Sequence, residues 1–217
     1  MTAVDARPHV TPPTLRVLHV LKVKGFAEPP ALAEATGLTE AAVADIVTAL
    51  AVAGHAIHRQ GRICGWGLSA EGKDEHLRLL AEDRDAASAE GALELAYLGF
   101  LDANERFKSL CTDWQLRAVG GELVVNDHTD AAYDAAIAPR LESLHACIVP
   151  VLDELMTALP RFASYALRLT RALERFKGGD GAALARPLSG SYHDVWMELH
   201  QDLLLSLAKE RGDSDGH

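Results

Sequence analysis

Several features that define other protein classes are missing from this sequence. The three cysteines, Cys64, Cys111 and Cys147, are odd in number and far apart, and they form no C-x-x-C pair, so a disulfide framework is excluded. The N-terminal residues show no apolar stretch typical of a signal peptide, and no apolar run reaches the roughly eighteen residues of a membrane span. We therefore expect a soluble, cytoplasmic protein with no membrane partner.

The compact motifs of common enzyme classes are missing as well. G-x-G-x-x-G, G-x-x-x-x-G-K-[ST], H-E-x-x-H and G-x-S-x-G do not occur. Asp113, Asp127, His128 and Asp130 could pair as acid and base, but capping residues in a solvated loop explain them as well. We expect no catalytic residue, no cofactor and no enzymatic activity.

Charge is distributed unevenly along the 217 residues, whose formal net charge is −10. Residues 1–80 carry eight basic and eight acidic side chains, whereas residues 81–217 carry 13 basic and 23 acidic ones. This asymmetry predicts two regions, a neutral domain at about 14–82 and an acidic domain at about 86–210.

Turn and capping signals divide the neutral region into short elements. Helices are expected to begin at Thr14, Pro29 and Thr39 and to end at Gly25, Gly37 and Gly54. Ile57, Ile63 and Leu68 then frame a polar tip at residues 59–62, which indicates two short strands around a glycine turn. Ser69 begins a fourth helix.

Helix, helix, helix, hairpin, helix is the order of a winged helix-turn-helix. Residues 38–54, the Arg-Gln-Gly-Arg tip and Leu-Ser-Ala-Glu-Gly-Lys at 68–73 resemble the MarR-like transcriptional regulators. The resemblance implies a transcriptional regulator that binds DNA through the third helix and the wing, with the helical bundle dimerising or sensing a small molecule. The expected DNA contacts are Thr39, Thr48, Arg59, Gln60, Arg62 and Lys73.

The third helix itself argues for an alternative. It presents Glu40 and Asp45, which would oppose phosphates, and it has no side chain able to make a bidentate contact to guanine or adenine. A winged helix that binds a protein partner therefore remains open.

Apolar stripes at helical spacing make the acidic region a helical bundle throughout, with Pro139 and Pro150 expected to kink or interrupt one helix. The seam from Leu93 to Trp114 could pair with a second copy in a homodimer or be buried within one bundle. Ser191 and Asp194 predict a capping box for the last helix.

The bundle also carries large amphipathic side chains that could line a pocket for a small-molecule effector. This expected pocket consists of Tyr97, Asn104, Trp114, Tyr133, His193, Trp196 and His200. The alternative is that aromatic stripes at helical spacing fill the core. His55, His58 and Cys64 lie near the hairpin, but their spacing is not that of metal ligands, so no metal is expected.

A second resemblance covers about residues 14–209. Residues 107–115, 126–130 and 191–200 are similar to the accessory winged-helix and helical regions that accompany actinobacterial pyruvate phosphate dikinases. It implies a regulatory or partner-binding module that acts on such an enzyme. It also agrees with an acidic third helix and an acidic bundle.

Overall fold

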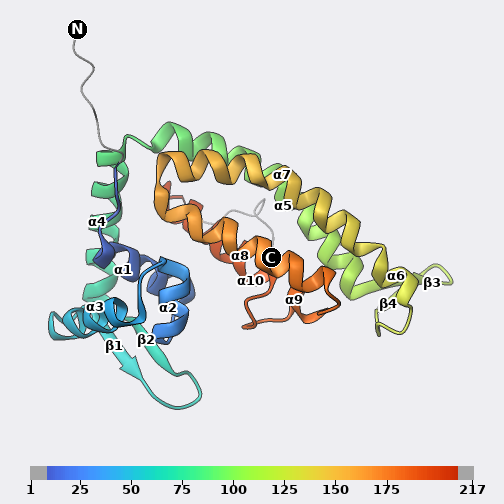
Figure 1. The fold of residues 1–217 in the computed structure, drawn as a ribbon, viewed down its shortest axis with the longest axis horizontal. Coiled ribbons are helices and arrows are strands. Elements are labelled where there is room, and N and C mark those ends of the chain that lie inside the picture. Colours follow the sequence, from blue (N-terminus) through green and yellow to red (C-terminus); the bar gives the residue numbers. More distant parts are fainter. Residues whose placement is uncertain (1–8, 210–217) are drawn as a thin grey trace, which may run out of the picture. The chain divides into compact units, whose positions relative to one another are not determined.

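The computed structural model describes residues 9–209, which are mainly helical (Figure 1). Within this range the short strands form two antiparallel hairpins, so the expected mainly α class with a small hairpin is confirmed. The described chain divides into two compact units. The first comprises residues 9–93, 155–164 and 201–209, and the second comprises residues 94–154 and 165–200.

The N-terminal segment of the first unit contains four helices and one hairpin. Their bounds are α1 (Pro13–Lys24), α2 (Pro29–Thr36), α3 (Glu40–Val52), β1 (Ala56–Arg59), β2 (Gly65–Leu68) and α4 (Ala70–Ala87). Thr39 caps α3 by accepting a hydrogen bond from the Ala42 amide, and Ser69 caps α4 in the same way. The expectation for Thr14 is wrong, because α1 already begins at Pro13, whose missing N–H costs nothing there.

The hairpin pairs β1 with β2 in antiparallel register, with Ala56 opposite Leu68 and Arg59 opposite Gly65. Ala27 adds a short bridge to the free edge of β2, exchanging two 2.9 Å hydrogen bonds with Trp66. This close approach requires Gly65, whose φ is +116° and whose added Cβ would lie 2.8 Å from the Ala27 backbone. The hairpin is thereby attached to the segment that follows α1.

Helices α1, α2 and α3 and the base of the hairpin share one apolar core. Its fully buried members are Val17, Leu18, Leu21, Leu32, Val43, Val47 and Leu50, with Ala27, Ala56 and Leu68 beside them. These residues recur at helical spacing in α1 and α3, which explains why the neutral region folds as its pattern predicts.

A buried charge network lies in the same unit and consists of His19, His76, Asp83, Arg161 and Asp202. The Arg161 guanidinium donates to both carboxylate oxygens of Asp202, at 2.7 and 2.8 Å. His19 contributes both ring nitrogens: Nε2 lies 2.9 Å from Asp202 Oδ1 and Nδ1 lies 2.9 Å from His76 Nε2. Asp83 accepts a hydrogen bond from Thr11 and lies 3.9 Å from Arg161. The network therefore joins residues from α1, α4 and the two C-terminal segments of the first unit.

Burial changes the titration of this network. Desolvation, together with the electrostatic effect of His19 and Lys22, lowers the pKa of His76 from 6.5 to about 3. Burial alone would raise the pKa of Asp202, but Arg161 and His19 hold it well below its usual range. His76 is therefore neutral and Asp202 ionised at physiological pH.

The remaining elements follow in the order α5 (Glu90–Gln115), β3 (Leu116–Val119), β4 (Glu122–Val125), α6 (Ala131–Ala135), α7 (Ile137–Ala158), η1 (Pro160–Phe162), α8 (Ala163–Lys177), α9 (Ala182–Ala185) and α10 (Tyr192–Ser206). The expectation of helix throughout is wrong at β3 and β4, which pair around Gly120 and Gly121. Pro150 does not interrupt α7. Ser191 and Asp194 form the expected capping box, each accepting from the other's backbone N–H.

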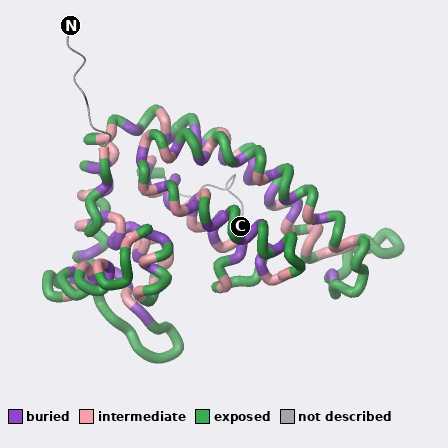
Figure 2. The backbone as a smooth tube through the Cα atoms, viewed as in Figure 1, coloured by how far each residue is buried: buried purple, intermediate pink, exposed green. Residues whose placement is uncertain are grey.

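Aromatic residues of α5 and α10 form the core of the second unit. Trp196 is fully buried, and its ring centroid lies 4.9 Å from that of Phe100 and 4.7 Å from that of Phe107. Its indole N–H donates to Asn104 Oδ1 at 2.8 Å. Figure 2 shows buried residues recurring along the long helices. The seam from Leu93 to Phe107 is thus covered within the chain, and a homodimer would need another surface.

Among the described residues, Ala131–Ala158 of α6 and α7 is long and apolar enough to cross a membrane by composition, with a mean hydropathy of 1.3 over an 18-residue window. Helices α2 and α3, which are bent by 109° at their junction, pass the same test only if they are counted as one span. In α7 the buried residues recur every three or four positions, at Ile137, Leu141, Leu144, Ile148, Leu152 and Leu155. Arg140, Glu142 and Asp153 lie exposed between them. This is the pattern of an amphipathic core helix.

Candidate functional site

Two regions contain the side chains that sequence reasoning selected, and the first is the surface of α3 and the β1–β2 hairpin. Arg59, Gln60 and Arg62 are exposed on the hairpin, where the Arg59 guanidinium lies 4.9 Å from the centroid of the Phe26 ring. Lys73 is exposed in the first turn of α4. The hairpin therefore brings three of the six expected DNA contacts together at one exposed tip.

Of the two threonines expected to face DNA, Thr39 immediately precedes α3 as its N-cap and Thr48 lies on α3, and both hydroxyls already have local partners. Thr39 accepts from the Ala42 amide as the helix cap, and the Thr48 hydroxyl donates to the Ala44 carbonyl at 2.7 Å. The exposed face of this helix consists of Glu40, Ala41, Ala44, Asp45, Thr48, Ala49 and Val52. Apart from a Thr48 hydroxyl, this face offers no side-chain hydrogen-bond donor.

The hairpin has the opposite electrostatic character from α3. No acidic residue occurs between Asp45 and Glu71, a stretch that includes Arg59 and Arg62. Arg62 has no ion-pair partner among residues 9–209. In a chain of net charge −10, the hairpin is therefore a local cationic projection.

The seven residues of the expected effector pocket do not line one cavity. The Trp196 indole N–H donates a hydrogen bond to Asn104 in the core, and His200 is buried beside Phe100 and Tyr97. His193 contacts Phe107, at 6.0 Å between ring centroids. The Tyr133 hydroxyl bonds to the carbonyl oxygens of Asp113 and Leu116, at 2.8 and 3.0 Å. The contacts of these five residues agree with the alternative interpretation, in which aromatic stripes at helical spacing fill the core.

Trp114 is the one member of that set that lines the large cavity of the second unit. This cavity, of about 890 Å³, lies between the ends of α5 and α8 and the short helices α6 and α9. Its aromatic wall is Trp114 packed edge-on against Phe176, with 5.2 Å between ring centroids. Gly181 lies against the Trp114 ring, where an added Cβ would be 3.3 Å away. Small side chains complete the apolar lining, at Ala135, Ala138, Ala182 and Ala185.

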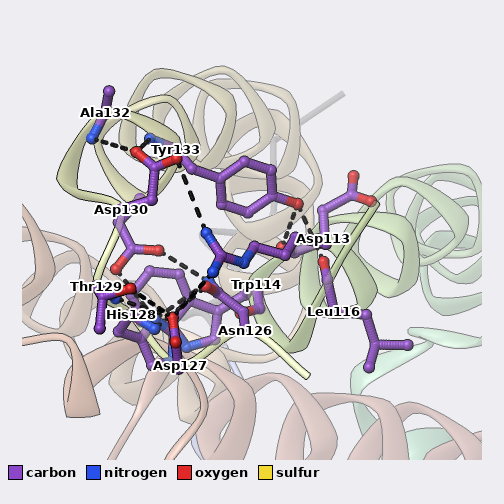
Figure 3. Close-up of polar contacts among 12 residues, drawn as sticks. Asp113, Trp114, Leu116, Asn126, Asp127, His128, Thr129, Asp130, Ala132 and Tyr133 are labelled. Carbon is purple, nitrogen blue, oxygen red and sulfur yellow. Dashed lines mark hydrogen bonds and ion pairs between the residues drawn. The ribbon is translucent and has the colours of Figure 1, made fainter. Parts of the chain in front are cut away.

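Three polar side chains of the cavity form a fixed cluster (Figure 3). The Asn126 side-chain amide donates to the Trp114 carbonyl at 3.1 Å and to Asp134 Oδ1 at 2.9 Å, which uses both of its hydrogens. His128 Nδ1 lies 3.0 Å from Asp134 Oδ2 and must therefore donate to it. His128 has a left-handed backbone with φ of 58° and packs on Trp114 at 4.3 Å between ring centroids. Its Nε2 atom has no hydrogen-bond partner among residues 9–209.

Nearby acidic side chains are engaged by the loop itself. Hydrogen bonds from Thr129, together with the Arg117 charge, lower the pKa of Asp127. Asp130 caps α6 and lies 3.8 Å from Arg117. Figure 3 shows Asp127 and Asp130 in this loop. Asp113 pairs with Arg140 at 2.7 Å. These contacts give the acidic side chains of the loop a structural role, which is to hold the loop at the rim of the cavity.

Sequence reasoning missed most of this cavity. Asn126, Asp134, Phe176 and Arg186 line it but were not selected, and His128 was considered only as a member of an acid–base pair. The available signal was the polar stretch 126–134, which comes shortly after Trp114 and separates two apolar stripes.

Residues 9–209 contain no group of three His, Cys, Asp or Glu side chains placed to hold a metal ion. Near the hairpin, the Cys64 thiol instead contacts Glu28 at 3.0 Å, and His58 packs against Trp66. No protein-family model, no curated protein and no solved structure matches the chain.

Proposed function

We propose that the N-terminal segment is a winged helix-turn-helix and that the protein is a MarR-like regulator that contacts DNA through the β1–β2 hairpin. In this proposal the protein is cytoplasmic, is not an enzyme and acts as a homodimer. The observation that carries it is the exposed pair Arg59 and Arg62 on a hairpin without any acidic residue. Guanidinium groups at such a tip suit phosphates and a narrow minor groove.

The composition of α3 limits the kind of recognition. Because its exposed face lacks amide and guanidinium donors, it cannot read guanine or adenine in a bidentate manner. Binding would therefore depend mostly on phosphate contacts from Arg59, Arg62 and Lys73. With about two or three phosphates neutralised by each protomer of the homodimer, log K should fall against log salt with a slope of roughly −4 to −5.

The test is fluorescence anisotropy with the DNA fragment upstream of the protein's own gene, at low and at near-physiological salt, with excess nonspecific competitor. Arg62→Ala should weaken binding and reduce the salt slope by about 2, because each protomer of the homodimer loses one phosphate contact. Arg78→Ala is the matched control, since Arg78 is exposed in the same unit but is neutralised by Glu75 and Glu82. No binding at low salt would overturn the proposal.

A second function is favoured by the same surface of α3. An exposed face made largely of Ala41, Ala44 and Ala49 fits a protein partner better than a phosphate backbone. The chain would then be an accessory module that docks on an enzyme such as a pyruvate phosphate dikinase.

The variant Ala44→Arg separates the two functions, because it places a cation in the middle of the exposed face of α3. An added guanidinium should tighten DNA binding, whereas it should block docking by its bulk and charge. If the protein binds DNA, Ala44→Arg should strengthen binding to the upstream DNA in the anisotropy assay. If it docks on an enzyme, Ala44→Arg should prevent complex formation with the purified dikinase.

A further inference from the structure

A groove of about 550 Å³ lies between α5 and α7 in the second unit, away from the cavity beside Trp114. Its lining consists of Glu105, Arg106, Ser109 and Leu110 from α5 and Pro139, Arg140, Ser143 and Leu144 from α7. Arg106 contacts Ser143, and Asp113 contacts Arg140, so the two helices run antiparallel here. The two arginines therefore lie towards opposite ends of the groove, with the two serines between them.

The exposed Arg106 guanidinium crosses from α5 to α7 without reaching a carboxylate. Its Nη1 donates to the Cys147 thiol at 2.9 Å and its Nη2 donates to the Ser143 hydroxyl at 3.4 Å. Arg106 has no ion-pair partner among residues 9–209, and the neighbouring Glu105 pairs instead with Lys108 at 3.0 Å. A thiol is a weak acceptor and the bond to the hydroxyl is long, so an anionic oxygen would give Arg106 stronger hydrogen bonds than it has.

The second arginine has donors to spare. The Arg140 Nη2 atom donates to Asp113 at 2.7 Å, in a pair whose side chains are 46% and 41% exposed. Within residues 9–209 the guanidinium makes no other hydrogen bond. Of its five N–H groups, most therefore remain for a second acceptor in the groove.

Two serine hydroxyls complete the set of donors. Thr112, also on α5, donates its hydroxyl to the backbone carbonyl four residues earlier, as hydroxyls in helices often do. Neither Ser109 nor Ser143 makes such a bond in the described part of the chain, and the Ser143 hydroxyl only accepts, from Arg106. Both serines can therefore donate a hydrogen bond to a bound group.

The charge and the size of the groove define its occupant. Two guanidinium groups line it, and the carboxylates near them are Asp113, bound to Arg140, and Glu105, bound to Lys108. A phosphate monoester, with nearly two negative charges and three acceptor oxygens, suits two guanidinium groups and two hydroxyls. The volume exceeds that of a phosphate group, and Leu110, Pro139 and Leu144 supply an apolar surface beside it.

We infer that this groove binds a small phosphate monoester, with the phosphate between Arg106 and Arg140 and the organic group on the apolar surface. Ser109 and Ser143 donate to the phosphate oxygens. The inference does not depend on DNA binding by the hairpin, since all of these residues belong to the second unit.

The experiment is isothermal titration calorimetry of the full-length protein at about pH 7.5, where a monoester is close to doubly charged, and at low ionic strength. The probes are monobutyl phosphate, butanesulfonate and inorganic phosphate. We expect monobutyl phosphate to bind with a dissociation constant on the order of 0.5 mM. Butanesulfonate should bind at least about fivefold more weakly because it carries one charge, and inorganic phosphate should also bind more weakly because it lacks the butyl group.

Two variants change the affinity in opposite directions. Arg106→Met should weaken binding of monobutyl phosphate about tenfold, because one of the two cations is lost. Asp113→Asn should tighten binding about threefold, because it removes the carboxylate that competes for Arg140, and an exposed ion pair of this kind contributes little to stability. A gain in affinity has no explanation in misfolding.

Arg175→Met is the matched control, since Arg175 is an exposed arginine of the same unit that pairs with Asp180 and lies outside the groove. It should leave the affinity unchanged. Equal affinity for the monoester and the sulfonate, an unchanged affinity in Arg106→Met, or an equal loss in Arg175→Met would each overturn the inference. A phosphoserine peptide that binds more tightly than monobutyl phosphate would overturn the assignment to a small molecule. Because no DNA is present, none of these results bears on the proposed DNA contact.

Discussion

The centres of the two units are stabilised by different kinds of interaction. In the first unit, Arg161 Nη1 donates to both carboxylate oxygens of Asp202 in an ion pair whose side chains are 5% and 2% exposed, and two histidines adjoin it. In the second unit, aromatic rings pack around Trp196, and one neutral hydrogen bond to Asn104 satisfies the only polar atom of that indole.

The two kinds of interaction differ because the two centres join different structural elements. The charge network joins α1 and α4 to residues 155–164 and 201–209, which are distant in the sequence, so directional bonds fix how these segments assemble. Aromatic packing in the second unit joins long helices through broad apolar surfaces, which stabilise by area more than by direction. Removing one charge from the network should therefore cost more than removing one polar group from the aromatic centre.

The largest effect is expected for Asp202→Asn. This change leaves the Arg161 guanidinium and the His19 ring buried beside a neutral group, which should lower the free energy of unfolding by about 3–5 kcal/mol. Urea unfolding at neutral pH measures it. The double variant Arg161→Met with Asp202→Leu should recover most of the loss, because the buried guanidinium is removed together with its partner and Asp83 keeps its contacts to His9 and Thr11. If Asp202→Asn loses no more stability than the surface variant Arg78→Ala, the network does not stabilise the first unit.

The next effect concerns pH. His76 has a pKa of about 3 in the folded protein, whereas an unfolded histidine titrates near 6.5, so on acidification the unfolded chain binds a proton that the folded chain does not. Its contribution should thus lower stability by up to about 1.4 kcal/mol per pH unit below pH 6.5, or roughly 2 kcal/mol between pH 7 and pH 5. The contribution of Asp202 is lost only at lower pH, because its folded pKa lies below the usual value.

The variant His76→Gln isolates this contribution, since its side-chain amide can still reach His19 but does not titrate. Urea unfolding of both proteins at pH 7 and pH 5 should show a smaller loss for the variant. Equal losses in the two proteins would mean that His76 is not buried in its neutral form.

Local chemistry explains which elements could be predicted from the sequence. Thr39, Ser69 and the pair Ser191 and Asp194 cap helices as expected, because capping depends on residues within one turn. The β3–β4 hairpin was missed because Leu116 and Val119 continue the apolar character of α5, and the two glycines signalled only a break. Turn residues show where a helix ends but not whether the next element is a helix or a strand.

The charge network and the cavity could not be predicted, for a different reason. His19, Arg161 and Asp202 belong to segments whose proximity only the tertiary fold determines, and each is unremarkable in its own stretch of sequence. Of the residues expected to line an effector pocket, only Trp114 lines this cavity, because an aromatic residue at helical spacing has the same pattern in a core as beside a cavity. Of the expected residues, Trp114 differs in standing at the end of α5, where the packing of the long helices stops.

The smallest effect is expected in the aromatic centre, for Asn104→Leu. Leucine removes the acceptor of the Trp196 indole N–H and leaves that donor buried without a partner, which should cost about 1–2 kcal/mol in urea unfolding. Thr112→Val is the matched control, because it removes an exposed hydroxyl, bonded to the Lys108 carbonyl, from the same helix. A loss in Asn104→Leu as large as that in Asp202→Asn would show that the hydrogen bond organises its unit as strongly as the charge network organises the other. A gain in stability would show that apolar packing alone sustains the second unit, with Asn104 retained for a reason other than stability.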